Sequence, residues 1–297
     1  MGACGEYPTI YIVISVHNRL DATRECLESL SCQTYKQFEV VLVDDGSADG
    51  TSDYIKKNCP EVTVLTGDGQ LWWTGATNLG VRYALERCQD DDYILTLNND
   101  TCLPAVYLET VISLSKKAPK ALIGSIARDH SQRDVVVDEG LMIHWFSAKF
   151  SKIKVPPAER IDRFYEVSAL PGRGTLIPIC VFHKVGLYDV KNFPHYGADY
   201  DFSLRAREIG YRLLLSPCCY LYSKPQMTGL SNVHNKISLA DWLKSFYSIK
   251  SPNNLKIRLR FGLRHAPPLC RPSFIVCDVF RVILGTFRNQ IKNIGAA

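Results

Sequence analysis

Three short polar clusters each follow an apolar run with the composition of a buried strand, and they hold the residues best suited to chemistry. The clusters are Ser15-Val16-His17-Asn18-Arg19, Asp44-Asp45-Gly46-Ser47 and Asn98-Asn99-Asp100. Strands of one parallel sheet point the same way, so we expect the clusters along one edge, where open α/β sheets bind ligands. Carboxylates and amides gathered there favour a ligand rich in hydroxyls and charge.

Two common phosphate-binding motifs are missing from the sequence. No G-x-G-x-x-G follows the first strand and no G-x-x-x-x-G-K-[ST] occurs, so neither a Rossmann dinucleotide site nor a P-loop is indicated. The charge of a diphosphate must then be met in another way. A divalent cation on Asp100 would do this, because Mg²⁺ and Mn²⁺ bind oxygen ligands, commonly one or two carboxylates plus substrate phosphates.

Alternating strands and helices position these clusters. Hydrophobic periodicity predicts strands at 11–16, 38–43, 62–65 and 93–97, and helices at 21–30, 49–57 and 76–87, with Asp21 as an N-cap. Repeated βαβ units imply a parallel sheet with right-handed crossovers.

The pattern weakens after Pro104. We expect helices at 108–114, 181–185 and 200–209, and strands at 122–126, 135–137 and 212–215, while residues 140–165 give no clear pattern. No internal repeat is found. One α/β body over residues 1–225, followed by a helical region over residues 226–297, is therefore predicted.

Five ordered motifs, spanning about residues 9 to 222, resemble the family 2 glycosyltransferases of the GT-A fold. They are Ser15-x-His17-Asn18-Arg19, Asp44-Asp45-Gly-Ser, Asn78-x-Gly80, Asn98-Asn99-Asp100 and Gly197-Ala-Asp199-Tyr-Asp201-x-x-x-Arg205. The loop Gly67–Gly75, with Trp72 and Trp73, is similar to that of rhamnosyltransferase-like members. The resemblance implies an α/β fold with a Rossmann-like, mostly parallel central sheet flanked by helices. It divides the body into a nucleotide-sugar-binding half (1–103) and an acceptor-binding half (104–225).

The resemblance also implies the activity, an inverting hexosyl transfer from a nucleotide-diphosphate sugar to an acceptor hydroxyl. Asp199 matches the catalytic base, and Asp201 and Arg205 would support it from the same helix, where a four-residue spacing lets them pair. Asp100 matches the metal ligand for Mn²⁺ or Mg²⁺. The expected donor-binding residues are Ser15, His17, Asn18, Arg19, Asp44, Asp45, Trp73, Asn78, Asn98, Asn99 and Arg173.

The nucleotide expected in this site is a pyrimidine, UDP or dTDP. The resemblance places Ser15 and Asp44 at the base and Asp45 near the ribose or base, and a carboxylate can accept from a uracil or thymine ring N–H. The Gly-rich stretch Pro171–Thr175 is expected to let the backbone approach the sugar or diphosphate, with Arg173 reaching the phosphates.

The sequence departs from the family pattern at two positions. Asn98 stands where the metal-binding motif usually has its first Asp, and Ala198 replaces the Glu that usually precedes the catalytic Asp. The loss of one negative charge is expected to weaken metal affinity. His234 is the first histidine after the last strand, and we expect it in solvent rather than on the metal.

Composition separates the body from its C-terminal region. The 297-residue chain is 46% hydrophobic and carries +5, but residues 226–297 hold eleven Lys/Arg against Asp241 and Asp278, which leaves the rest mildly acidic. Eleven cysteines without zinc-site spacing favour a reduced, cytoplasmic protein. We expect neither a signal peptide nor a spanning helix.

The basic C-terminal region has two interpretations. Residues 276–294 have the spacing of an amphipathic helix. Such a helix could pack on the catalytic body or on a second subunit, or it could lie on anionic lipid as a peripheral membrane anchor. Nucleic acid is not an expected partner, because no known module is present.

These features favour a glycosyltransferase of surface polysaccharide assembly, with a saccharide acceptor that could be lipid-linked. Two alternatives stay open at this stage. One is a sugar nucleotidyltransferase, although that class normally has a Gly-rich, Arg/Lys-bearing loop after the first strand. The other is a non-catalytic chain that binds a sugar nucleotide or acts as a scaffold, which the changes at Asn98 and Ala198 allow.

Overall fold

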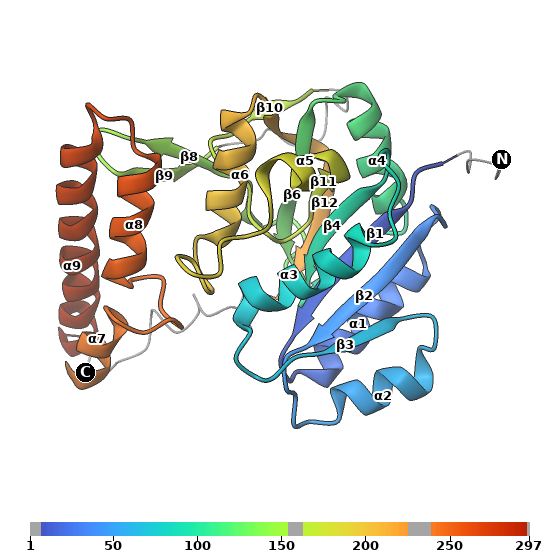
Figure 1. Cartoon of the computed structure of the whole chain (residues 1–297). Helices are drawn as coiled ribbons and strands as arrows, with labels where there is room; N and C mark the ends of the chain where they lie inside the picture. Colours follow the sequence, from blue (N-terminus) through green and yellow to red (C-terminus); the bar gives the residue numbers. More distant parts are fainter. Residues whose placement is uncertain (1–6, 154–162, 225–238, 296–297) are drawn as a thin grey trace.

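The first hundred residues form four parallel strands joined by helices, as predicted. The computed structural model describes residues 7–153, 163–224 and 239–295, with side chains described to residue 286 (Figure 1). The parallel strands lie side by side in the order β3-β2-β1-β4. Along the chain they and their helices are β1 (Ile10–Val16), α1 (Leu20–Ser31), β2 (Phe38–Asp44), α2 (Thr51–Asn58), β3 (Thr63–Thr66), α3 (Trp72–Leu85) and β4 (Tyr93–Asn98).

The second half extends the same sheet and adds an antiparallel strand within it. β11 (Thr175–Pro178) lies between β4 and β6 (Ala121–Asp129) and is antiparallel to both. β12 (Arg212–Ser223) pairs in parallel with β6 and is far longer than the predicted 212–215. The prediction of a mostly parallel sheet is confirmed. The remaining elements here are β5 (Thr101–Cys102), α4 (Tyr107–Lys117), β7 (Val136–Asp138), β8 (Leu141–His144), β9 (Lys149–Lys152), β10 (Tyr165–Glu166), α5 (Ile179–Val185) and α6 (Ala198–Glu208).

Two helix starts differ from the predictions. Asp21 is not the N-cap of α1, because the helix begins at Leu20, whose N–H donates to Asp49 Oδ2 from the next loop at 2.9 Å. Helix α3 begins at Trp72, four residues before the predicted start, and Trp72 N donates to Asp45 Oδ2 at 2.9 Å. In both cases a carboxylate distant in sequence satisfies an N–H of the first turn, which local patterns cannot reveal.

The C-terminal region packs on the body. It contains α7 (Leu239–Ser245), α8 (Leu255–His265) and α9 (Arg271–Gly295), and α8 lies between α9 and α6 (Figure 1). Ile257, Phe261 and Phe274 belong to the same hydrophobic core cluster as Phe193 and Phe202 of the body. Helices α8 and α9 therefore share a core with the first 225 residues.

Two global properties complete the description. None of the helices in the described ranges combines the length and apolar character needed to cross a bilayer. None of the ten cysteines within the described residues forms a disulfide.

Candidate active site

The three polar clusters meet at one edge of the sheet, as expected. Ser15 of β1 lies opposite Asn98 of β4, and Val16 lies opposite Asp44 of β2. Asp45 N donates to Val16 O at 2.8 Å, which continues the pairing just beyond the strands. The register therefore brings the ends of β1, β2 and β4 level with one another.

The Asp44-Asp45 pair organises the loops at this edge. Both residues are buried. Asp45 accepts from Gly69 N through Oδ1 at 2.8 Å and from Trp72 N through Oδ2 at 2.9 Å, so its carboxylate holds the loop that opens α3. Asp44 Oδ1 accepts from Ser47 N at 2.8 Å. The expected contacts of both residues with a nucleotide stay predictions.

His17 and Asn18 join the loop after β1 to the loop after β2. His17 Nδ1 lies 2.7 Å from Asp45 O, and Asn18 Oδ1 accepts from Ala48 N at 2.9 Å. Asn18 and Arg19 both have positive φ, at 60° and 69°. This tight turn fixes the chain that leads from β1 into α1.

Asp100 has the environment of a metal ligand. It is 3% exposed, and its Oδ1 is buried without a hydrogen-bond partner in the described part of the chain. Burial raises the pKa of Asp100 above its usual value, while the nearby Arg173 and Arg19 guanidinium groups act in the opposite direction. A buried carboxylate oxygen left unpaired is costly, and a cation would satisfy it. The residues present fit a divalent ion at this position.

The two asparagines before Asp100 anchor the strand end. Asn98 Oδ1 accepts from Trp73 Nε1 at 3.2 Å, and Asn99 Nδ2 donates to Thr23 Oγ1 of α1 at 3.0 Å. Asn98 accepts through its amide oxygen, a contact that an Asp at this position could also make, whereas Asn99, at the middle position of the motif, donates an N–H that a carboxylate lacks. Trp73 thus binds the end of β4 through Asn98.

Trp73 connects the donor side of the site to the loop before β11. Its ring lies against Gly172 so closely that a Cβ on Gly172 would overlap it. Its ring also packs edge-on against Tyr188, with 5.5 Å between the ring centroids. Glycine at position 172 is therefore required by this contact with an indole, and the expected approach of the Pro171–Thr175 backbone to the sugar or diphosphate stays a prediction.

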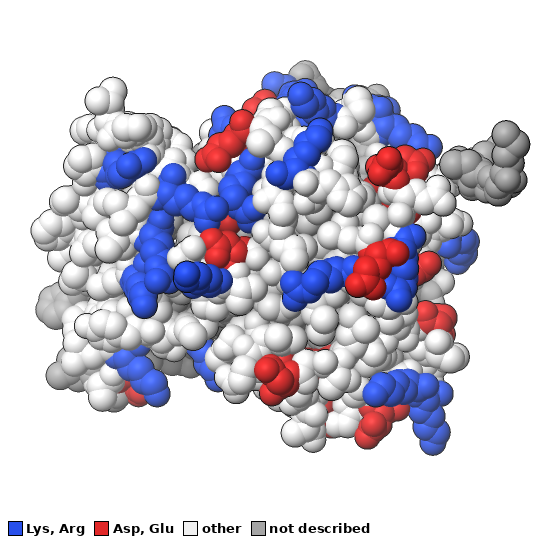
Figure 2. All heavy atoms as spheres, viewed as in Figure 1, with Lys and Arg blue, Asp and Glu red and all other residues white. Residues whose placement is uncertain are grey.

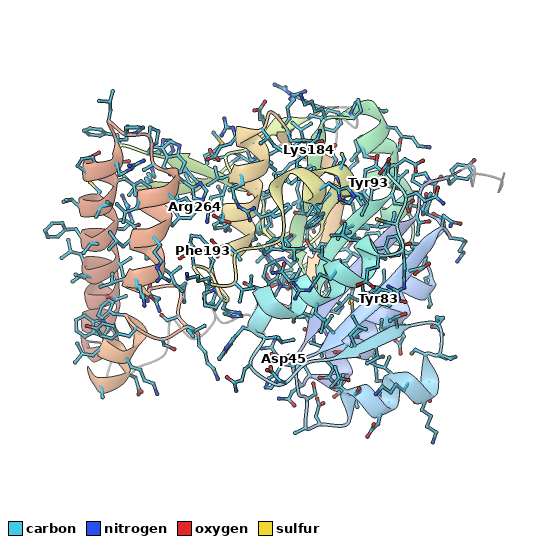
Figure 3. All side chains as sticks on the ribbon, in the orientation of Figure 1. Asp45, Tyr83, Tyr93, Lys184, Phe193 and Arg264 are labelled. Atoms are coloured by element: carbon cyan, nitrogen blue, oxygen red, sulfur yellow. The ribbon has the colours of Figure 1, made fainter. Side chains whose placement is uncertain are left out.

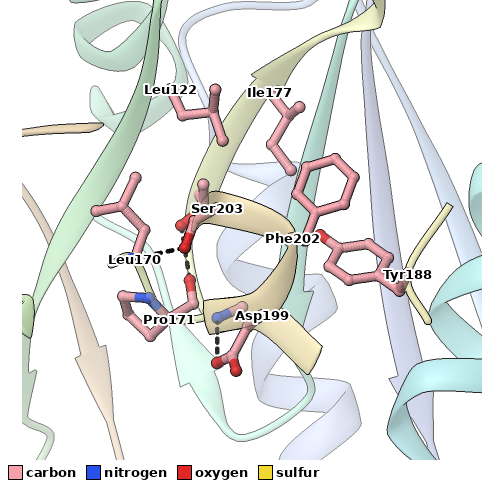
Figure 4. A pocket seen from close by; sticks show the side chains of 10 residues that line it. Leu122, Leu170, Pro171, Ile177, Tyr188, Asp199, Phe202 and Ser203 are labelled. Atoms are coloured by element: carbon pink, nitrogen blue, oxygen red, sulfur yellow. Dashed lines mark hydrogen bonds between the residues drawn. The ribbon is translucent and has the colours of Figure 1, made fainter. Parts of the chain in front are cut away.

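Asp199 occupies the second position of α6, next to this loop. Its Oδ2 accepts from Gly172 N and its Oδ1 from Tyr200 N, both at 2.9 Å. The carboxyl group lines a small pocket with Pro171, Gly172 and Phe202 (Figure 4). Burial raises the pKa of Asp199 to about 6 despite the two N–H donors, which lower it. A carboxylate with a pKa near neutrality is suited to taking up a proton.

Asp201, one turn into α6, is the centre of a buried ionic cluster. Its Oδ2 accepts from Arg205 Nε at 2.9 Å, the pair that the four-residue spacing predicts. Its Oδ1 lies 2.9 Å from His265 Nε2 and 3.2 Å from Arg264. Both partners come from the end of α8, where Arg264 is labelled in Figure 3. His265 and Arg264 were missed by sequence reasoning, because nothing local connects residues 64 positions apart.

Two other predicted donor residues are engaged with protein groups. Asn78 is buried, and its amide exchanges two hydrogen bonds with the backbone of Tyr188, at 2.8 and 3.0 Å. Arg173 pairs with Asp138 of β7 at 3.1 Å and donates to Ser223 Oγ at 3.2 Å. The structure gives both residues a structural contact, and their contact with a donor stays a prediction.

The aromatic rings of Trp72 and His195 lie in contact beside the site. Trp72, with φ 57°, contacts His195 with 6.0 Å between ring centroids, and the Lys250 ammonium lies 5.3 Å from the Trp72 ring centroid. Burial and Lys250 lower the pKa of His195. Lys250 comes from the segment between α7 and α8, so the C-terminal region reaches the site. His234 lies outside the described residues.

A separate set of ligand-type atoms comes from α1, from β5 and from the residue after β6. Glu25, Cys102 and His130 place one atom each within 4.8 Å of one another. Lys224 Nζ, however, is 2.5 Å from Glu25 Oε2. The Lys224 ammonium group therefore supplies the positive charge beside Glu25, and we assign these residues an ion-pair role rather than a metal site.

Comparison with known proteins decides the family. Residues 11–163, about half of the chain, match the sequence model described as glycosyl transferase family 2. The chain belongs to this family. This chain is 25% identical over 205 residues to an uncharacterized glycosyltransferase of Rickettsia typhi. The matched region covers 65% of this chain and 57% of that protein. It is also 28% identical over 105 residues to glycosyltransferase GlyA of Streptococcus pneumoniae, a match that covers 34% of this chain and 14% of GlyA. It thus spans little more than half the length of its Rickettsia relative, and less of GlyA.

Solved structures share the fold of this family 2 chain. Mannosyltransferase PcManGT from Pyrobaculum calidifontis, in complex with GDP-Man and Mn²⁺, superposes with a TM-score of 0.57 over 98% of this chain and 74% of its own. GalNAc-T7 with UDP, GalNAc and Mn²⁺ gives a TM-score of 0.62 over 94% of this chain and 56% of its own. Sequence identity is 15% in both cases. The predicted GT-A fold is confirmed.

Proposed function

We propose that this chain is an inverting glycosyltransferase that moves a hexosyl group from a UDP- or dTDP-sugar to an acceptor hydroxyl. The observation that carries the proposal is the short chain of contacts between the two carboxylates. Asn98, beside Asp100, holds Trp73; Trp73 packs on Gly172; and Gly172 N binds Asp199. A buried carboxylate with an unpaired oxygen and a second one with a raised pKa are thereby fixed in one site.

Asp199 would act as the general base. Each of its oxygens accepts one backbone N–H and keeps a further lone pair for an acceptor O–H. The acceptor oxygen would attack the anomeric carbon and form the new C–O bond, while the bond from that carbon to the phosphate oxygen breaks with its electron pair. The proton of the acceptor passes to Asp199. A single displacement of this kind inverts the anomeric centre.

Asp100 would hold the divalent cation, Mn²⁺ or Mg²⁺. Both structural neighbours carry Mn²⁺ together with a nucleotide or nucleotide sugar, which supports this assignment. A bound divalent ion stabilises negative charge on phosphate oxygens as a Lewis acid. Arg173 and Arg19, both close enough to act on the charge of Asp100, would add positive charge at the same place. The sugar nucleotidyltransferase alternative lacks support from the family match.

The acceptor and biological role are proposed on broader grounds. The basic C-terminal region and the family suggest a saccharide in surface polysaccharide assembly, carried on a lipid at the cytoplasmic face of a membrane. The Gly67–Gly75 loop with its Trp pair favours a rhamnosyl-type sugar.

A thermal-shift screen tests the donor assignment. UDP, dTDP, GDP and CMP are each added with and without Mn²⁺ to the wild type, to Asp100→Ala and to Asp53→Ala, which removes an exposed carboxylate of α2 as the control. A ligand at a hundred times its Kd stabilises the native state by about 2.7 kcal/mol. We expect a Mn²⁺-dependent rise in melting temperature with UDP or dTDP that Asp100→Ala abolishes and Asp53→Ala retains. Equal shifts in wild type and Asp100→Ala would exclude the metal assignment, and turnover of no sugar despite donor binding would favour the non-catalytic alternative.

A further inference from the structure

The α8–α9 pair turns an apolar face away from the body. Helix α9 packs inward through Phe274, Asp278 and Val282, all buried. Val276, Phe280 and Leu284 are 53%, 60% and 60% exposed, and their four-residue spacing places them together on the opposite side of the helix. The amphipathic helix predicted from the sequence therefore exists, but its apolar face does not cover the core.

Exposed apolar side chains are concentrated in this part of the molecule. Of the seventeen large apolar side chains that are exposed among the described residues, ten lie between residues 239 and 286. In Figure 2 the left edge, where α9 lies in Figure 1, is correspondingly mostly white. A concentration of this kind marks an interaction surface. Its members are Leu243, Tyr247, Ile249, Leu259, Leu263, Leu269, Val276, Phe280, Ile283 and Leu284.

The same segment is strongly basic. Between residues 239 and 286 there are eight Lys/Arg and only two acidic residues, Asp241 and Asp278. Asp278 is buried and already paired with Arg258. Within the described ranges, Lys256, Arg260 and Arg281 form no ion pair with a carboxylate. Arg260 and Arg281 donate to the carbonyl oxygens of Lys191 and Ser147, whereas Lys256 is exposed. A partner that accepts apolar side chains and also carries negative charge suits this segment.

We propose that the outer face of the α8–α9 hairpin docks on an anionic lipid bilayer, with the helices lying in the interface. Apolar side chains would enter the headgroup boundary, and the cations would meet anionic headgroups. A second copy of the chain fits less well, because a symmetric contact would place two basic segments against each other. Nucleic acid offers the charge but no apolar surface for Phe280 and Leu284.

Docking through this face has a consequence for the site, which rests on the proposed function. Lys250, from the same C-terminal region, lies over Trp72 at the start of α3. A membrane-bound hairpin would therefore keep the catalytic body, which the C-terminal region contacts through Lys250, at the membrane that carries a lipid-linked acceptor.

Vesicle co-sedimentation of the full chain tests the proposal. The probes are vesicles of phosphatidylcholine alone and of phosphatidylcholine mixed with phosphatidylglycerol. We expect binding to the anionic vesicles that weakens with salt. Phe280→Ser/Leu284→Ser should weaken it at least tenfold, because two exposed apolar groups are lost. Lys256→Gln should weaken it about fivefold, the effect of one cation near an anionic surface. Val106→Ser, at a comparably exposed apolar site just before α4, should bind like the wild type.

Three outcomes would overturn the inference. One is the absence of vesicle binding by a folded, monomeric chain. Another is equal binding by the wild type and Phe280→Ser/Leu284→Ser at matched melting temperature. The third is a concentration-dependent dimer that the double variant dissociates, because the face would then be a subunit interface. Donor binding by the thermal-shift screen is measured in the same samples, so failure of docking is distinguished from failure of the proposed function.

Discussion

Asp199 is bound by two backbone N–H groups and yet has a pKa above its usual value. The N–H groups lower the pKa, but burial opposes them and sets the result at about 6. The balance gives a carboxylate that is ionised at neutral pH and still basic enough to accept a proton. Ala198, the departure from the family pattern beside it, is fully buried in the core, where an ionised Glu would be costly.

A pH profile tests the role of Asp199. Because the base must be deprotonated, kcat/KM should rise as the pH is raised through about 6 and level off above it. Asp199→Asn should lower kcat by about a hundred- to ten-thousand-fold while leaving the UDP or dTDP thermal shift intact. Full transfer activity in Asp199→Asn, or a wild-type profile flat through pH 6, would contradict the assignment.

At the scale of elements, α8 braces the helix that carries the base. Asp201 lies two residues after Asp199 and is fully buried, and its carboxylate can only accept, so His265 must donate through Nε2. Arg205 adds to this brace by donating to Val185 O and Leu187 O, at 2.8 and 2.9 Å. The start of α6 is thus fixed by α8 and by the loop after α5.

Removal of the His265 contact should affect the reaction more than donor binding. We expect His265→Leu to lower kcat for transfer several-fold and stability by about 1–3 kcal/mol, since Asp201 loses a buried donor. The donor-dependent thermal shift should be unchanged. His265→Gln, which restores an N–H, should recover part of kcat, and His183→Leu on the exposed face of α5 serves as the control. A purely structural role would instead lower stability without a change in kcat for the folded fraction.

The elements differ in how far the sequence could predict them. The buried strands β1, β2 and β4 were predicted within one or two residues, since runs such as residues 10–16 are apolar on both faces. β11 was missed because its four residues are followed at once by α5 and have no pattern of their own. The grouping of Asp100 with Asn98 and Asn99 was also predictable, because it follows from one strand end. The partners of Asp45 and Asp201 were not, because they arise only from tertiary packing.

At the scale of the whole molecule, the C-terminal helices are part of the folded body. Ile257, Phe261 and Phe274 are buried with Trp145 and Phe150 of the β8–β9 region. A chain truncated before Leu239 should lose roughly 1.5–3 kcal/mol for each large apolar side chain removed from the core. We therefore expect it to melt well below the full chain or to aggregate.

Thermal denaturation of two truncations measures this contribution. A chain ending at Thr286 keeps Phe274, Asp278 and Val282 and should melt close to the full chain. A chain ending before Leu239 that melts as high as the full chain would show that the helices add nothing to the body. Because deletion of these helices also removes core side chains, point variants of the outer face are the proper test of membrane docking.

The position of β11 also affects how the chain folds while it is being synthesised. Its residues 175–178 pair with β4 on one side and with β6 on the other, although both partners precede it in the chain. While the ribosome is still adding the residues before 175, β4 has an unpaired edge next to the emerging site. Unpaired strand edges promote association between chains. The nascent polypeptide therefore passes through an interval in which a chaperone would be most useful, and that interval ends when β11 pairs with β4 and β6, before β12 is added.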